Sequence, residues 1–123
     1  MVIDTSVFIE FLRSKDKKDT TLYKLPDNTV YSLSAVTLFE LFMGATTVDK
    51  KKDILLLTEG LNILSFNNDV AAKAGEIYHQ LRKDNKMIEF RDIFIAATCI
   101  IYELPLVTLN IKHFSRIKDL TLT

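Results

Sequence analysis

Residues 1–13, MVIDTSVFIEFLR, place a carboxylate between two apolar segments. The pair Val2–Ile3 is typical of the end of a buried strand, and the apolar residues of Val7–Leu12 favour a buried helix. Asp4 lies between them, where the strand would lead into the helix. Ser6 is the predicted N-cap of that helix. The stretch therefore predicts a βα unit with an acid at the carboxyl end of its strand.

Short apolar runs continue to alternate with longer segments of helical period, which indicates an α/β fold with a short, mainly parallel central sheet. The predicted strands are Val2–Ile3, Thr29–Leu33, Leu61–Phe66 and Leu106–Leu109, with a further short strand possible at Leu120–Leu122. Capping residues and apolar periodicity predict the helices. They are Val7–Leu12, Ala35–Met43 after Ser34, Val48–Glu59, Val70–Lys83 after Asn68 or Asp69, and a helix from Glu89–Asp92 to Ile101.

Composition and charge limit the class of protein. Of 123 residues, 48% are hydrophobic, three are glycine and two are proline, which is typical of a globular chain and predicts one domain over residues 1–123. Sixteen basic residues balance sixteen acidic ones, so a nucleic-acid partner would need a local basic rim. Asp4 interrupts any signal peptide, and the longest apolar run, Ile93 to Tyr102, is shorter than the roughly 20 residues that cross a bilayer. We therefore expect a cytoplasmic protein without a membrane segment.

Four polar residues from distant parts of the chain are predicted to reach one edge of the sheet. Asp4 and Asn110 directly follow strands, and ligands of open α/β sheets bind at the carboxyl ends of strands. Asp92 lies in the first turn of the helix that leads into the last strand, which returns it to the same edge. Glu40 sits among apolar residues of a helix that leaves this edge. Each residue alone also has a structural explanation, as a helix N-terminal acid, an ion-pair member or a turn former.

Three acids that converge in a partly buried site repel one another unless a cation compensates. Oxygen ligands without Cys or His favour a hard ion, Mg²⁺ or Mn²⁺. Such an ion retains waters and suits the hydrolysis of a phosphodiester. The shared edge therefore predicts a metal-dependent hydrolytic site.

Four segments in order, MVIDTSVFIEFL, TLFELFMG, EFRDIFIAATCI and LVTLNIKHFSRI, span nearly the whole chain. With them the sequence resembles the PIN-domain ribonucleases, in particular the VapC-like toxins of type II toxin–antitoxin pairs. The resemblance implies a three-layer α/β/α fold around a short parallel sheet and a metal-dependent endoribonuclease site. It also implies three partners: an RNA substrate, a cognate antitoxin protein and a second copy of the chain in a homodimer.

Carried over residue by residue, the resemblance implies that Asp4, Glu40 and Asp92 are acidic metal ligands. Asn110 falls where many family members have an aspartate, which leaves three negative charges instead of four and favours operation with one metal ion. Glu89 lies close enough to replace the missing charge, although a solvent-facing role suits it better.

Supporting roles are predicted around these ligands. Ser6 can cap its helix or donate to Asp4 or a phosphate, and Thr108 can hold a carboxylate or simply belong to its strand. Arg91 is a candidate for phosphate contact, whereas Arg13 is better explained as ordinary surface charge. For His113 we expect a structural role beside Phe114.

Two other functions remain open from the sequence. A PIN-like domain could bind RNA or protein without cutting, which the neutral net charge and Asn110 both allow. Alternatively, Asp4 could form an aspartyl phosphate, as in haloacid-dehalogenase-like phosphatases. Those enzymes place a second aspartate two residues later, where this chain has Ser6.

Overall fold

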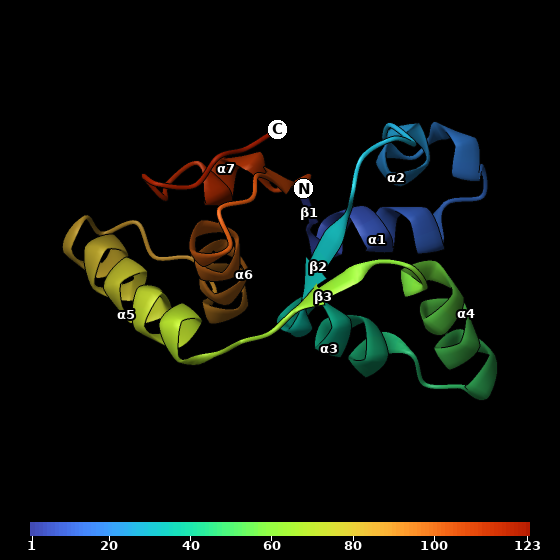
Figure 1. Cartoon of the computed structure of the whole chain (residues 1–123), viewed down its shortest axis with the longest axis horizontal. Helices are drawn as coiled ribbons and strands as arrows, with labels where there is room; N and C mark the ends of the chain where they lie inside the picture. The colour runs from blue at the N-terminus through green and yellow to red at the C-terminus, as the bar shows by residue number, and fades with distance from the viewer.

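The computed structural model describes residues 1–123, and Figure 1 labels its elements. The strands are β1 (Val2–Ile3), β2 (Ser32–Ser34), β3 (Asn62–Leu64) and β4 (Leu106–Val107). The helices are α1 (Thr5–Arg13), α2 (Thr21–Lys24), α3 (Ala35–Gly44), α4 (Val48–Thr58), α5 (Asn68–Lys83), α6 (Phe90–Ile101) and α7 (Ile111–Phe114), with a 3-10 turn at Lys17–Asp19. None of the helices combines the length and the hydrophobicity needed to cross a membrane.

The four strands form one parallel sheet in the order β3-β2-β1-β4. The chain builds outward from β1 through β2 to β3 and then returns to the other side of β1 for β4. The strand order therefore reverses between β1 and β4. In open α/β sheets this reversal opens a crevice at the carboxyl ends of the two strands.

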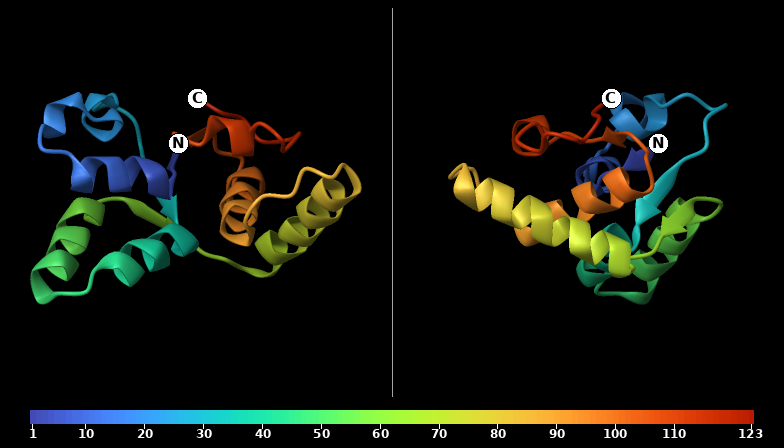
Figure 2. Two further views of the ribbon diagram at one scale, coloured as in Figure 1. Left: turned by 180° about the vertical axis from the view of Figure 1, so that it is seen from behind. Right: turned by 60° about the vertical axis from the view of Figure 1, so that its left-hand side comes forward.

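Alternation along the short strands divides the apolar side chains between two cores, one on each face of the sheet. Val2 and Leu106 pack with α5, α6 and Phe114. Their neighbours Ile3 and Val107 point the other way and pack with α1, α3 and α4. Figures 1 and 2 show this division, with α5 and α6 on one side of the sheet and α1, α3 and α4 on the other. The predicted three-layer α/β/α fold with a parallel sheet is confirmed.

The strands are shorter than predicted. The segment Thr29–Leu33 contributes only its end to β2, and Val30 is 70% exposed. Leu61–Phe66 shortens to β3, and Leu106–Leu109 shortens to the two residues of β4. Leu120–Leu122 forms a single bridge, from Leu122 to Leu106, instead of a strand. The apolar runs are longer than the strands because the residues at their ends pack against helices or stay exposed instead of pairing in the sheet.

Capping side chains determine where the helices begin. Ser34 caps α3 as predicted, and its hydroxyl accepts from Thr37 N at 3.0 Å. Asn67, not Asn68 or Asp69, caps α5. Ser6 is not the N-cap of α1: that helix begins at Thr5 and Asp4 is its cap. The periodicity did not predict the short helices α2 and α7, which are single turns.

Candidate metal and nuclease site

Asp4 lies in the crevice between β1 and β4, directly after β1, and only 2% of it is exposed. Its backbone N–H donates to Val107 O at 2.9 Å, which closes the ladder between the two strands. It is also the N-cap of α1, so it lies at the start of that helix. The strand end and the helix start together fix the position of this acid.

Two hydroxyl groups hold the Asp4 carboxylate. Ser6 Oγ donates to Asp4 Oδ2 at 2.6 Å and Thr108 Oγ1 donates to the same oxygen at 2.8 Å. The hydroxyls in turn accept from the backbone of the β4–α7 turn, Ser6 from Leu109 N and Thr108 from Asn110 N. All side-chain hydrogen bonds to Asp4 end on Oδ2, which leaves Oδ1 available to a ligand.

Glu40 comes from α3 and is 14% exposed at its side chain. Both of its oxygens have partners. Thr5 Oγ1 donates to Oε1 at 2.8 Å, and Arg91 Nη1 of α6 lies 3.2 Å from Oε2. Thr5 Oγ1 also lies 3.0 Å from Thr37 Oγ1, so a pair of buried threonines packs beside the Glu40 carboxylate. The guanidinium of Arg91 is the positive group that pairs with the Glu40 carboxylate.

Asp92 lies in the first turn of α6 and its side chain is 18% exposed. Burial, the largest cause, and the charges of Asp4, Glu40 and Glu89 together raise its pKa from an ordinary 3.8 to about 6. His113 Nδ1, 3.7 Å from Asp92 Oδ2, acts in the opposite direction. Because the charges of Asp4 and Glu40 contribute to this shift beside burial, the three acids share one electrostatic environment.

Asn110 stands at the same edge, as the N-terminal residue before α7. It is exposed, and its side chain makes no capping hydrogen bond. Its amide oxygen is thus available at the rim of the crevice. The structure therefore brings all four predicted residues to one end of the sheet.

The four side chains suit a hard divalent ion in their chemistry, because they offer carboxylate and amide oxygens without a thiolate. No set of three or more His, Cys, Asp or Glu side chains is already arranged as a metal site. Two features fit a bound cation: the free Oδ1 of Asp4, and the pKa of Asp92, which is raised by burial and by the charges of Asp4 and Glu40. To bind the cation through Oε2, Glu40 would have to give up its ion pair with Arg91.

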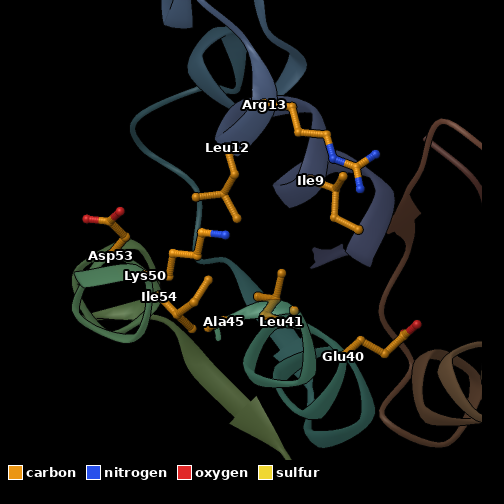
Figure 3. A pocket seen from close by; sticks show the side chains of 10 residues that line it. Ile9, Leu12, Arg13, Glu40, Leu41, Ala45, Lys50, Asp53 and Ile54 are labelled. Atoms are coloured by element: carbon orange, nitrogen blue, oxygen red, sulfur yellow. The ribbon is translucent and has the colours of Figure 1, made fainter. Parts of the chain in front are cut away.

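A groove of about 390 Å³ between α1, α3 and α4 adjoins this site (Figure 3). Ile9, Leu12 and Leu41 provide apolar walls, and Lys50 points into the space between the helices. Glu40 stands at its edge and reaches toward α6. Arg13 also lines the groove and is exposed, in agreement with the surface position expected for it.

Two contacts of the acids were not predicted. Thr5 binds Glu40, and its signal in the sequence was only its place directly after Asp4. His113, for which a structural role beside the buried Phe114 is predicted, is 47% exposed at its side chain, and its Nδ1 lies 3.7 Å from Asp92 Oδ2. Glu89 is exposed, as expected, and pairs with Arg91.

Comparisons with known proteins agree with this architecture. A family model described as PIN domain matches residues 1–120. Ribonuclease VapC3 of Methanocaldococcus jannaschii is 34% identical over 96 residues, which cover 78% of this chain and 94% of that protein.

Solved structures give the same result. VapBC-1 from nontypeable Haemophilus influenzae superposes with a TM-score of 0.85 at 28% identity, over 99% of this chain and 95% of that one. VapBC-5 from Mycobacterium tuberculosis, described as a member of the VapBC family of toxin–antitoxin systems, gives 0.65 at 26% identity, over 87% and 82%. The chain belongs to the PIN domain family, and its relatives there include VapC ribonucleases.

Proposed function

We propose that this protein is a divalent-metal-dependent endoribonuclease and the toxin of a toxin–antitoxin pair. The observation that carries the proposal is the position of Asp4, Glu40 and Asp92 where the strand order reverses. Burial and the charges of Asp4 and Glu40 raise the pKa of Asp92 there. The name of its relative Ribonuclease VapC3 supports the nuclease activity, and the description of VapBC-5 as a member of the VapBC family of toxin–antitoxin systems supports the role as a toxin.

The acids and Asn110 would hold Mg²⁺ or Mn²⁺. When bound, such an ion neutralises phosphate charge and activates a water for hydrolysis of the phosphodiester. The chain itself orients the ligands. Ser6 and Thr108 fix Asp4 through Oδ2, and Thr5 fixes Glu40 through Oε1. Each hydroxyl limits the rotation of a carboxylate that has to face the ion.

The substrate would approach over a local basic rim, since the chain as a whole has no net charge. Arg91 lies beside Glu40, and Arg13 and Lys50 line the adjoining groove. Guanidinium groups bind phosphate oxygens in pairs, and such contacts position a nucleic acid without reading its sequence. These three residues are the proposed phosphate contacts.

The groove between α1, α3 and α4 is the proposed site for the antitoxin. It combines apolar walls with both Lys50 and Asp53, which suits a segment of a protein that offers apolar and charged side chains together. The M. tuberculosis relative is described as part of a toxin–antitoxin system, which supports a protein partner here.

A second function is favoured by two observations. Arg91 already neutralises Glu40, and no ready metal cluster exists. A PIN-like domain that binds RNA or protein without cutting would fit those two features.

One experiment distinguishes the two functions. The purified protein is incubated with structured RNA and Mn²⁺ or Mg²⁺, and compared with Asp4→Asn, Asp92→Asn and a sample in EDTA. We expect cleavage by the wild type to fall at least about a hundredfold in either variant, because each loses a charged ligand. Asp27→Asn is the matched control, since Asp27 is an exposed acid in the loop before β2, away from the crevice.

RNA binding without any difference in cleavage between wild type and the two site variants would favour the non-catalytic function. Cleavage that survives in EDTA would contradict the proposed metal dependence.

A further inference from the structure

Arg91 forms two ion pairs that differ in exposure. Its Nη1 lies 3.2 Å from Glu40 Oε2, and its Nη2 lies 3.1 Å from Glu89 Oε2. The Glu40 side chain is 14% exposed and that of Glu89 is 71% exposed. Arg91 itself is 44% exposed, so it connects the acid inside the crevice with an acid in solvent.

The inner pair occupies the atom that a cation would use. Thr5 donates to Oε1 of Glu40, and the guanidinium takes Oε2. Asp4, in contrast, keeps Oδ1 free, and Asp92 meets only the more distant His113. Of the three acids, Glu40 is therefore the one whose charge the chain already neutralises at ion-pair distance.

We infer that Arg91 competes with the divalent ion for Glu40 and that a substrate phosphate removes this competition. The inference rests on the proposed metal-dependent function. A guanidinium binds phosphate at least as well as carboxylate, and a half-exposed side chain can turn outward without losing core contacts. Arg91 thus positions Glu40, and it releases that acid when RNA is present.

This arrangement couples two binding events. If phosphate draws Arg91 away from Glu40, RNA raises the affinity of the site for the metal, and the metal raises the affinity for RNA by the same factor. The protein without RNA would then bind its metal weakly.

The test measures Mn²⁺ affinity by titration calorimetry without RNA. We expect Arg91→Gln to bind Mn²⁺ about fivefold more tightly than the wild type, the factor that corresponds to losing a partly exposed ion pair. Arg91→Lys keeps the positive charge and should stay close to the wild type. Lys52→Gln is the control for net charge, because Lys52 is an exposed lysine of α4 without an ion pair.

A second titration uses a 2′-O-methyl oligoribonucleotide, which cannot be cleaved. It should tighten Mn²⁺ binding to the wild type and do so much less for Arg91→Gln. Circular dichroism verifies the fold of each variant. If Arg91→Gln does not fold, Arg91→Met replaces it with the same expected result, and the wild-type titration stands without any variant.

Equal or weaker Mn²⁺ binding by Arg91→Gln would overturn the inference. If the wild type still cleaved RNA with Mn²⁺ in that case, the proposed function would stand and only the role of Arg91 would fall. Absence of Mn²⁺ binding in every variant, with and without the oligonucleotide, would overturn both.

Discussion

Asp92 makes the stability of the protein depend on pH in the direction opposite to that of an ordinary ion-paired acid. Its pKa is about 6 when folded and 3.8 when unfolded, so the folded state binds the proton more tightly. The contribution of Asp92 to stability is therefore fully present below about pH 4 and is lost as the pH rises through about 6. The loss amounts to at most about 3 kcal/mol, at about 1.4 kcal/mol per pKa unit.

Replacing Asp92 with asparagine should remove this dependence. In EDTA above about pH 6, Asp92→Asn should be more stable than the wild type, and the difference should vanish near about pH 4. Urea denaturation of both proteins across that range measures it. A difference that does not change with pH would show that Asp92 has no raised pKa in the folded state.

Asn110 is the residue at which this chain departs from the family pattern described above. Asn110→Asp adds a fourth negative charge at the exposed rim of the crevice, so Mn²⁺ affinity should rise about tenfold. Calorimetry measures the change. Asn28→Asp adds the same charge in the loop before β2 and should leave the affinity unaltered. An Asn110→Asp protein with wild-type affinity would place residue 110 outside the ligand set.

The positions of the acids could be predicted because topology alone places strand ends and helix starts. Asp4 and Asn110 follow strands, and Asp92 lies in the first turn of α6. The pairing of Arg91 with Glu40 could not be predicted, since a long side chain chooses its partner from groups that only the folded chain brings within reach. Thr5 was missed for the same reason: its role depends on Glu40, 35 residues away.

The turn from β4 into α7 connects the candidate site to the sheet through its hydrogen bonds to Asp4 and Ser6. Thr108 leaves the strand after only two residues of β4 and bonds to Asp4, which explains why the predicted strand to Leu109 is too long. The apolar residues around Thr108 predict a longer strand. The strand ends earlier because the hydroxyl of Thr108 donates to the buried carboxylate of Asp4. Ser6 is likewise not the N-cap of α1, because its hydroxyl donates to the carboxylate of Asp4.

Thr108→Val tests this turn with little change in shape. It removes the donor to Asp4 Oδ2 and the acceptor for Asn110 N, which should lower the free energy of unfolding by about 1–3 kcal/mol. Mn²⁺ affinity should fall as well, because Asp4 loses one of the two hydroxyls that orient it.

The control is Thr58→Val in α4. Thr58 is buried and donates to Ile54 O at 2.8 Å, so the variant should lose stability without any change in Mn²⁺ affinity. If both variants bound Mn²⁺ alike, the β4–α7 turn would have no role in the site beyond folding.

An exposed aromatic patch lies beside the site, outside the buried residues of the two hydrophobic cores. We define it as Phe39, Phe66, Phe90 and Phe94, of which the first three are exposed. Phe39, Phe66 and Phe94 line a hollow of about 360 Å³ next to Arg91, and the rings of Phe66 and Phe94 meet edge to face at 5.0 Å. A contiguous exposed apolar patch of this kind indicates a protein interface.

We propose that a second copy of the chain covers this aromatic patch. The groove beside α1 would then remain free for the antitoxin, since it lies on the other side of α3 from the hollow and shares none of its residues. Two separate surfaces allow the dimer and the toxin–antitoxin complex to exist together.

Phe39→Glu should convert the dimer to a monomer, because it places a charge in the centre of an apolar contact, where desolvation costs several kcal/mol. Analytical ultracentrifugation across a dilution series measures the dissociation constant. Leu55→Glu is the matched control: Leu55 in α4 is 59% exposed, as is Phe39, but lies outside the patch. Dissociation by Leu55→Glu and not by Phe39→Glu would move the interface to α4, and a monomeric wild type at every concentration would refute the homodimer.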